Sequence, residues 1–565
     1  MTTYADRPWF AHYASDVPHD IPAQTGSLSH LIDTAVAEYP GHVALKFFGA
    51  TTTYSELGDG IARVAHSLHK LGVRKGDRVA IVLPNCPQHV VAFYAVLRLG
   101  AVVVEHNPLY TPRELRHQFE DHGAQIAIVW DKAAPTVRDL PHDLGVTRII
   151  TVDLTRAMPL SKRMALKLPV PAARTARGKL TATPPRGTIA WEKMLATRRI
   201  KRTHARPEQG DLALIQYTSG TTGVPKGVML SHGNLLANAA QARAWVPAIK
   251  RGSAVVYAVL PLFHAYGLTQ SLTFAMSMGA RLVLFPTFDP DLVLAVIKKR
   301  PPTFLPAVPP IYQRLVAAAK ERKISLAGIQ IAISGAMNLP ASIVELWEKE
   351  TGGYLVEGYG LSECSPVLMA NPVGSSRRDG TVGLALPSTQ LRVVDPNDLS
   401  SDRPFGEPGE LLARGPQVFS GYWQKPAETA QALTTDGWFR TGDIVTMDAD
   451  GFVSIVDRIK ELIITGGFNV SPTEVEDALR GGHGIADVAV VGLPHGRGGE
   501  DVVAAVVMQP GASFDEDAIR AFARENLTAY KVPRHVVQVD ELPRSLIGKV
   551  LRKQVRDALL AEHGS

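Results

Sequence analysis

Two long stretches of the chain alternate short apolar runs with segments of helical period. In residues 78–152 the runs RVAIVLP, AVVVEHNP and QIAIVW are separated by PQHVVAFYAVLRLG and TPRELRHQFEDHG, and residues 211–360 repeat this alternation. Strands that alternate with helices of this length are typical of βαβ units, in which helices cover both faces of a parallel sheet. We therefore predict an α/β fold with a large N-terminal domain of doubly wound sheets.

The pattern changes in the second half of the chain. Residues 378–456 hold short strands and turns, among them TVGLAL and GWFRTGDIV, which predict a small β-barrel-like subdomain. Residues 463–565 mix strand and helix patterns and predict a small α+β domain. The charged stretch DRIKEL, residues 457–462, separates the two, although such a run also fits a solvated surface. The predicted N-terminal domain thus covers residues 1–456.

The charge of the chain is concentrated in one segment. The 565 residues carry 60 Lys and Arg against 54 Asp and Glu, but residues 156–202 alone hold thirteen basic residues and a single acid, Glu192. The rest of the chain is therefore acidic, and a nucleic-acid partner is not expected. We predict that this basic insert is irregular with short helices. An anionic membrane surface and plain solvation explain its charge equally well.

The composition excludes several classes of protein. Hydrophobic residues make up 45% of the chain, which is too much for a disordered tail, and two cysteines, Cys86 and Cys364, cannot form a disulfide framework. The first thirty residues lack a signal-peptide pattern, and no apolar run approaches the roughly eighteen residues of a membrane span. We expect a cytoplasmic protein.

The most informative stretch is YTSGTTGVPKG, residues 217–227, which follows a strand-like run and precedes a helix that Ser231 can cap. Small and hydroxyl-bearing residues let backbone N–H groups approach an anion, and Lys226 adds a positive charge. A Walker A loop is excluded, because Pro225 precedes the lysine and Gly227 follows it. The predicted phosphate-binding residues are Thr218, Ser219, Gly220, Thr221, Thr222, Gly223 and Lys226.

Three further clusters complete a predicted nucleotide site. SGAMNLP, residues 334–340, offers small residues on which a planar base can lie. In EGYGLSECSP, residues 357–366, Tyr359 can stack on a purine and Glu363 can bind Mg²⁺. In GWFRTGDIV, Asp443 can accept hydrogen bonds from ribose hydroxyls. Each cluster alone also fits a turn, a core tyrosine or a surface carboxylate.

Single residues are less informative. His264 follows the apolar run PLF and is equally consistent with a structural and a functional histidine. Cys364 is expected to be a small core residue. Lys549, in LPRSLIGKVLRK near the end, would by itself be read as a solvent-facing lysine.

The motifs YTSGTTGVPKG, YGLSE, GWFRTGD, DRIKELIITGGFNVSPTEVE and PRSLIGK together resemble the adenylate-forming superfamily in order and spacing. This superfamily contains acyl-CoA synthetases, peptide-synthetase adenylation domains and luciferases. NPLYTPREL and GYWQKP are most similar to the bacterial long-chain fatty acyl-CoA synthetases. The basic insert is the weakest part of the resemblance. Ser362 stands where the family usually has threonine and keeps the hydroxyl group.

The resemblance implies a two-step reaction with ATP, Mg²⁺ and coenzyme A. A medium- to long-chain fatty acid is activated to acyl-adenylate, and coenzyme A then displaces AMP. It implies that Lys549 bridges carboxylate and α-phosphate, that residues 457–462 form a hinge with Lys460 as pivot, and that rotation brings Gly466 and Gly467 to the nucleotide. By the same resemblance, Thr218 and Glu363 bind Mg²⁺, His264 borders the carboxylate, and Asp443 and Arg458 bind ribose. Adenine is held by Gly335, Ala336, Glu357, Gly358 and Tyr359, and Ser362 is a further cofactor-binding residue.

Alternatives remain open at this level. A fatty acyl-AMP ligase that loads a carrier protein is the closest one, and a catalytically idle fatty-acid-binding protein is another. The acyl chain is expected along residues 267–279 and near 330–335. Peripheral contact with the inner face of the membrane through residues 156–202, and a homodimer, are further hypotheses.

Overall fold

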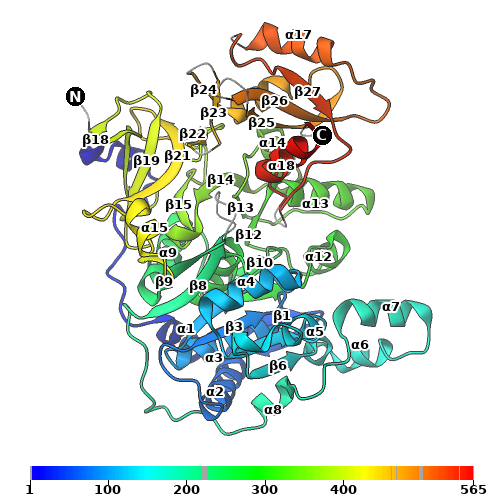
Figure 1. Cartoon of the computed structure of the whole chain (residues 1–565). Coiled ribbons are helices and arrows are strands. Elements are labelled where there is room, and N and C mark those ends of the chain that lie inside the picture. The colour runs from blue at the N-terminus through cyan, green and yellow to red at the C-terminus, as the bar shows by residue number, and fades with distance from the viewer. Residues whose placement is uncertain are drawn as a thin grey trace. The chain divides into compact units, whose positions relative to one another are not determined.

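In the computed structural model the chain divides into two compact units, shown in Figure 1. The large unit comprises Trp9–Gln390 and Arg414–Phe439, and the small unit comprises Met1–Pro8, Leu391–Ala413 and Arg440–Ser565. The structure describes residues 3–218, 225–459, 461–465, 468–494, 500–527, 529–545 and 548–563.

A nine-stranded sheet of the large unit has the order β16-β15-β14-β13-β12-β10-β11-β1-β2. Its centre is parallel and its edges are antiparallel. The central strands are buried along their length, as strands covered by helices on both faces must be. The strands are β1 (Val43–Phe47), β2 (Ala50–Thr53), β10 (Val255–Ala258), β11 (Arg281–Leu284), β12 (Phe304–Ala307), β13 (Ile331–Ser334), β14 (Tyr354–Gly360), β15 (Val367–Ala370) and β16 (Leu384–Ala385).

An eight-stranded sheet of the same unit has the order β20-β9-β8-β4-β3-β5-β6-β7. It is parallel from β8 to β7 and ends in the antiparallel strands β9 and β20. These two sheets confirm the predicted doubly wound α/β architecture. The strands are β3 (Arg78–Val82), β4 (Val102–Glu105), β5 (Ile126–Trp130), β6 (Arg148–Val152), β7 (Ile189–Ala190), β8 (Leu212–Thr218), β9 (Lys226–Ser231) and β20 (Gly421–Tyr422).

Helices connect the parallel strands, and local signals set where several of them begin. Ser231 caps α9 as predicted, because its side chain accepts a hydrogen bond from the backbone N–H of Asn234. The helices are α1 (Leu28–Glu38), α2 (Tyr54–Lys70), α3 (Pro87–Arg98), α4 (Pro112–His122), α5 (Ala134–Arg138), α9 (His232–Trp245), α10 (Ala265–Gly267), α11 (Phe274–Ser277), α12 (Pro290–Ile297), α13 (Pro309–Glu321), α14 (Ala341–Thr351) and α15 (Pro426–Ala432).

The described part of the small unit contains three sheets, of which the smallest pairs β23 with β24. A five-stranded sheet, in the order β18-β17-β19-β21-β22, forms the predicted β-rich part, and a three-stranded sheet has the order β25-β26-β27. One face of the latter packs against α16 and α17, and the other face packs against α18. The elements are β17 (Gln390–Asp395), β18 (Asp398–Asp402), β19 (Gly409–Arg414), β21 (Phe439–Met447), β22 (Val453–Arg458), β23 (Ile463–Thr465), β24 (Phe468–Val470), α16 (Pro472–Leu479), β25 (Ile485–Pro494), β26 (Glu500–Met508), α17 (Glu516–Asn526), β27 (His535–Gln538) and α18 (Arg552–His563).

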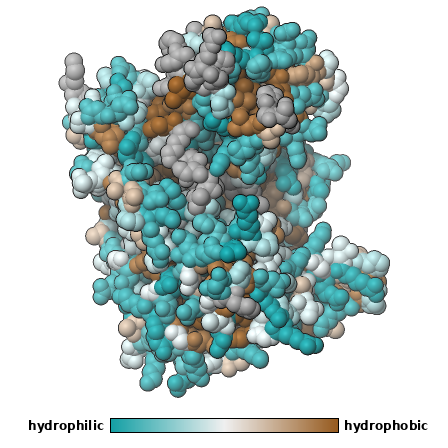
Figure 2. All heavy atoms as spheres, in the orientation of Figure 1, coloured by the Kyte–Doolittle hydropathy of each residue, from teal (hydrophilic) through white to brown (hydrophobic). Residues whose placement is uncertain are grey.

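The basic segment forms short helices that lie beside the eight-stranded sheet. α6 (Leu160–Ala165) and α7 (Pro171–Leu180) bury no residue and project from the large unit in Figure 1, whereas α8 (Trp191–Leu195) is anchored by buried side chains. Figure 2 shows apolar surface between hydrophilic side chains on this projection. Within the described ranges, no helix is long and apolar enough to cross a bilayer.

Candidate active site

The hairpin of β8 and β9 holds both ends of the predicted phosphate loop. Thr218 ends β8 and lies opposite Lys226, the first residue of β9. The Nζ of Lys226 lies 5.1 Å from the centre of the Tyr422 ring. The other predicted phosphate ligands, Ser219, Gly220, Thr221, Thr222 and Gly223, lie outside the described residues, so their role stays a prediction.

Glu363 lies on the short 3-10 turn η6 (Ser362–Cys364) and is buried. The hydroxyl of Tyr422 donates a hydrogen bond of 2.8 Å to Oε1 of Glu363. Burial, together with the charge of Glu363, raises the pKa of Tyr422, so the phenol remains a donor at neutral pH. Tyr422 reaches this place on β20, which pairs with β9. Its contact with Glu363 is not visible in the sequence, because nothing in the local pattern around Tyr422 links the two residues.

The two predicted magnesium ligands, Thr218 and Glu363, carry oxygen atoms of the kind that this ion binds. Glu363 supplies a buried carboxylate, and Thr218 supplies a hydroxyl group; both are the hard oxygen ligands that Mg²⁺ prefers. No cluster of three or more His, Cys, Asp or Glu side chains that could hold a metal occurs in the described part of the chain. Mg²⁺ usually takes one or two carboxylates and completes its shell with water and phosphate oxygens. Thr218 and Glu363 could therefore supply the protein part of a magnesium shell, and their role as ligands stays a prediction.

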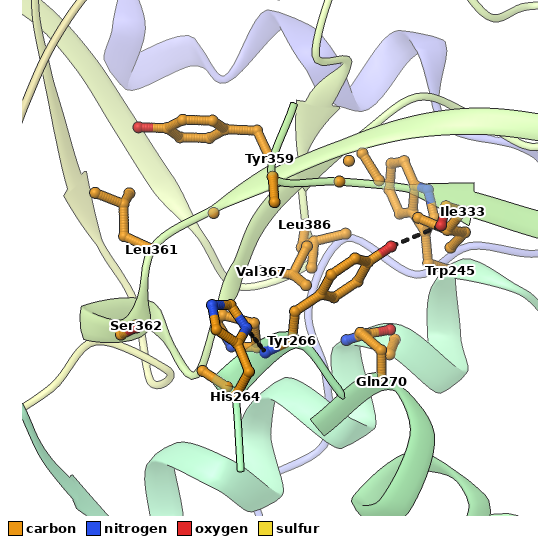
Figure 3. Close-up of a pocket in the computed structure, with 18 residues that line it drawn as sticks. Trp245, His264, Tyr266, Gln270, Ile333, Tyr359, Leu361, Ser362, Val367 and Leu386 are labelled. Carbon is orange, nitrogen blue, oxygen red and sulfur yellow. Dashed lines mark hydrogen bonds between the residues drawn. The ribbon is translucent and has the colours of Figure 1, made fainter. Parts of the chain in front are cut away.

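One pocket of the large unit brings together six of the predicted site residues, and Figure 3 shows it in close-up. Its empty space measures about 650 Å³, part of which is open to solvent. Small residues that follow β13 or lie on β14 face a mostly apolar lining, which suits a planar base or a hydrocarbon group. The six residues are His264, Gly335, Ala336, Gly358, Tyr359 and Ser362.

Two glycines allow neighbouring groups to pack closely in the wall of this pocket. A Cβ on Gly335 would lie 3.2 Å from the ring of Tyr266, and a Cβ on Gly360 would lie 1.9 Å from the carbonyl oxygen of Pro366. Tyr266 is fixed in turn, because its hydroxyl donates a 2.6 Å hydrogen bond to the carbonyl of Ile333. Larger side chains at these glycines would displace the wall of the pocket.

Glu357 lies on β14 but is not among the residues that line the described pocket. Burial raises its pKa to about 8, against the opposing effect of a hydrogen bond from the backbone N–H of Leu339. The carboxyl group is therefore mostly protonated at neutral pH and can donate a hydrogen bond. Its predicted contact with adenine stays a prediction.

His264 is neutral and oriented. Its Nδ1 accepts a hydrogen bond of 3.3 Å from the backbone N–H of Tyr266, as Figure 3 shows. The protein around the ring lowers the pKa of His264 to about 4. A neutral imidazole whose Nδ1 accepts carries its proton on Nε2. His264 can therefore donate a hydrogen bond to a carboxylate without adding charge.

A buried amide, far away in sequence, positions the loop before this histidine. Nδ2 of Asn85 donates to the carbonyl of Leu260 at 2.7 Å, and Oδ1 accepts from the backbone N–H of Leu262 at 2.7 Å. Sequence reasoning did not identify Asn85, because the contact spans 177 residues.

In the small unit, three predicted residues come together. Asp443 on β21 lies opposite Arg458 on β22, and the Nε of Arg458 is 2.8 Å from Oδ1 of Asp443. Lys549 lies within their electrostatic field: the positive charge of Arg458 is the main cause of its lowered pKa, while Glu461 and Asp443 oppose the shift. The other predicted residues here, Lys460, Gly466 and Gly467, lie outside the described residues.

An ion network that the sequence did not reveal fixes the segment next to Lys549. Nε and Nη2 of Arg552 donate to both carboxylate oxygens of Glu476, at 2.9 and 2.8 Å. Nη1 of the same guanidinium bonds to Glu461 and lies 3.6 Å from Asp457. The network joins Asp457 and Glu461, two residues of the predicted hinge, to α16 and α18.

Family models and curated relatives match most of the chain. The AMP-binding enzyme family matches residues 32–423, and the AMP-binding enzyme C-terminal domain matches residues 474–549. A long-chain-fatty-acid–CoA ligase from Bacillus subtilis is 38% identical over 560 residues, covering 99% of both chains, and one from Salmonella typhimurium is 37% identical over 556 residues, covering 97% of this chain and 98% of the relative.

Among solved structures, ATP-bound MatB from Rhodopseudomonas palustris is 31% identical, with a TM-score of 0.80 over 94% of this chain and 98% of its own. The family models cover most of the chain, the relatives match it along nearly their full length, and the fold is shared. This chain belongs to the AMP-binding enzyme family, within the adenylate-forming superfamily.

Proposed function

We propose that this chain is an AMP-forming long-chain fatty acid–CoA ligase. One observation carries the proposal: a single pocket joins the small residues of a nucleotide platform, a neutral histidine and an apolar chamber. The curated ligases that resemble the chain along nearly its whole length support it. A carrier-loading fatty acyl-AMP ligase is not favoured by these relatives.

The reaction has two balanced steps. In the first, a carboxylate oxygen of the fatty acid forms a bond to the α-phosphorus of ATP, and the bond to pyrophosphate breaks. In the second, the sulfur of coenzyme A bonds to the acyl carbon, the thiol proton is released, and AMP departs. A bound Mg²⁺, with Thr218 and Glu363 as ligands, would offset phosphate charge during the first step.

The residues of the chain have separate tasks in this proposal. Nε2–H of His264 orients the carboxylate, and Lys549 offsets the charge between carboxylate and α-phosphate. Asp443 and Arg458 hold the ribose. Rotation about residues 457–462, with Lys460 as pivot, exchanges Lys549 for Gly466 and Gly467 between the two steps, so one site serves two reactions.

The test is product analysis with purified protein. ATP, Mg²⁺, coenzyme A and straight-chain acids of increasing length are supplied without any carrier protein, and AMP and acyl-CoA are measured. We expect one AMP for each thioester, with the highest kcat/KM for a medium- to long-chain acid. Release of acyl-adenylate without thioester would favour the carrier-loading alternative, and no acid-dependent release of pyrophosphate would refute the ligase.

We further propose that the enzyme is cytoplasmic and binds the inner face of the membrane peripherally through residues 156–202. Four large apolar side chains of this segment are exposed, among them Leu160 at 68% and Met164 at 57%; the others are Leu168 and Val170. Basic side chains flank them on α6 and α7. Exposed apolar groups among cations fit an anionic bilayer, in which fatty acids partition.

Liposome flotation tests this contact. We expect the wild type to float with anionic vesicles and less with neutral ones, and Leu160→Glu to weaken flotation. Leu560→Glu, at an exposed leucine of α18, is the matched control and should float normally. Equal flotation of the wild type with both vesicle types would refute the contact. A homodimer, our remaining hypothesis, is tested by sedimentation equilibrium, where a single monomer mass would refute it.

A further inference from the structure

One polar side chain lies in the apolar wall of the pocket. Gln270 lines it together with Trp245, Ile333 and Leu386, and only 2% of its surface is exposed. In Figure 3 its amide nitrogen is directed toward Tyr266 and the interior of the pocket. Gln270 lies in the segment 267–279, where the sequence analysis expected the acyl chain. A hydrocarbon chain alone gives such an amide nothing to bind.

The backbone that carries Gln270 is unusual. Residues Leu268–Thr273 form a π-helical segment, η5, between α10 and α11. π-helical turns are rare and occur frequently at functional sites, since the extra residue per turn changes which side chain faces inward. The side chain of Thr269 is fixed in this segment, because its hydroxyl donates 2.6 Å to the carbonyl of Ser365. The segment therefore presents Gln270 to the pocket from a fixed backbone.

The amide nitrogen of Gln270 has no hydrogen-bond acceptor among the described residues. A buried donor without a partner is costly, and the great majority of buried polar atoms have one. Another buried amide of the same unit, Gln241, shows the normal case: its Nε2 donates to the carbonyl of Pro387 at 2.8 Å and to Oε1 of Gln417 at 3.0 Å. Unlike Gln241, Gln270 has no acceptor for its amide nitrogen in the part of the chain that the structure describes.

We propose that Gln270 recognises an oxygen atom on the acyl chain, so that the enzyme prefers fatty acids that carry a hydroxyl group. This inference rests on the proposed ligase function. A hydroxyl oxygen accepts a hydrogen bond from the amide N–H, and the hydroxyl group can in turn donate a hydrogen bond to the amide oxygen. A site built to bond a substrate hydroxyl discriminates strongly against the analogue that lacks it, because its own polar group then stays unpaired.

The experiment compares two acids of equal chain length, one unsubstituted and one hydroxylated, with the hydroxyl scanned along the chain. For the wild type we expect kcat/KM for the best hydroxy acid to exceed that for the unsubstituted acid by about 10- to 100-fold. Gln270→Leu should lower kcat/KM for the hydroxy acid by about the same factor and preserve or raise that for the unsubstituted acid. The change should lie mainly in KM.

The control is Thr273→Val, a substitution of nearly equal volume at a buried polar residue of the same π-helical segment that does not line the described pocket. It should leave the ratio of the two acids unchanged. If Gln270→Leu is active on the unsubstituted acid, this variant is folded. If it is inactive on that acid, Gln270→Met serves as a second variant. Equal kcat/KM for both acids in wild type, or a ratio that Gln270→Leu leaves unaltered, overturns the inference while the ligase function stands. A wild type that activates neither acid overturns both.

Discussion

Replacing Arg552 by methionine should loosen the segment that carries Lys549. Methionine keeps much of the apolar stem and removes only the guanidinium. That group makes two hydrogen bonds to Glu476, one to Glu461 and one, of 2.7 Å, to the hydroxyl of Thr473. Glu476 is 6% exposed, so its carboxylate cannot regain water without opening of the structure. The variant leaves the buried carboxylate of Glu476 without its two short hydrogen bonds to Arg552, and the remaining ion pair, to Arg480, is longer at 3.8 Å.

The magnitude follows from this burial. Breaking a buried ion pair by removing one partner costs about 3–5 kcal/mol. The side chain of Arg552 is 18% exposed, which places the expected loss at the lower end, about 3 kcal/mol. Since 1.36 kcal/mol corresponds to a factor of ten, opening of α16 and α18 should become roughly 150-fold more frequent.

Hydrogen exchange of the amides in α16 and α18 measures this opening directly. Arg556→Met is the matched control on the same helix, because Arg556 pairs with Glu500 at 3.1 Å but is 40% exposed, and surface pairs contribute about 0–1 kcal/mol. Its amides should exchange at most about fivefold faster. Equal amide exchange rates in Arg552→Met and Arg556→Met would show that burial of the ion pair does not determine its contribution to stability.

The effect of Arg552 should also depend on pH. Burial of Glu461 opposes its ionisation, but Arg552, Lys549 and Arg458 outweigh this effect, so the pKa of Glu461 is lowered. A carboxylate with a lowered folded-state pKa stabilises the fold above the unfolded value of about 4.3 and loses this contribution as the pH falls through the folded value. The difference in exchange between wild type and Arg552→Met should therefore shrink below about pH 4.

Three further predictions concern catalysis. Lys549→Ala should lower acid-dependent pyrophosphate exchange by at least about 100-fold and spare thioester formation from preformed acyl-adenylate. The control Lys553→Ala, at an exposed residue of α18, should alter neither half-reaction. Equal loss of both half-reactions in Lys549→Ala would contradict the proposed domain rotation. Because the pKa of His264 is lowered to about 4, kcat/KM for adenylation should show no inflection from this residue between pH 5 and 8. An inflection near 6.5 that disappears in His264→Asn would contradict the lowered pKa of this histidine. Tyr422→Phe removes the 2.8 Å hydrogen bond that orients Glu363, so half-maximal adenylation should require about 10- to 100-fold more Mg²⁺, and an unchanged Mg²⁺ titration would refute this positioning role.

Much of the fold can be predicted from the sequence, because the patterns that determine it are local. The strand-helix alternation in residues 78–152 and 211–360 predicts parallel sheets, since periodicity depends only on neighbouring residues. Ser231 caps α9 through a bond to a residue three positions on. Thr218 and Lys226 come together because their strands follow each other closely in the sequence and pair antiparallel. The family resemblance added the roles of residues that no periodicity could assign.

The rest required tertiary structure, because it depends on contacts between distant parts of the chain. Tyr422 meets Glu363 across 59 positions, Asn85 fixes the loop before His264 across 177, and Arg552 reaches Glu461 across 91. None of these pairs leaves a trace in local composition. Gln270 is a similar case: an ordinary helical period would not reveal which of its neighbours faces the pocket, since a π-helical segment shifts the phase. Sequence alone thus determined which elements form and which chemistry they carry, while packing decided which side chains support that chemistry.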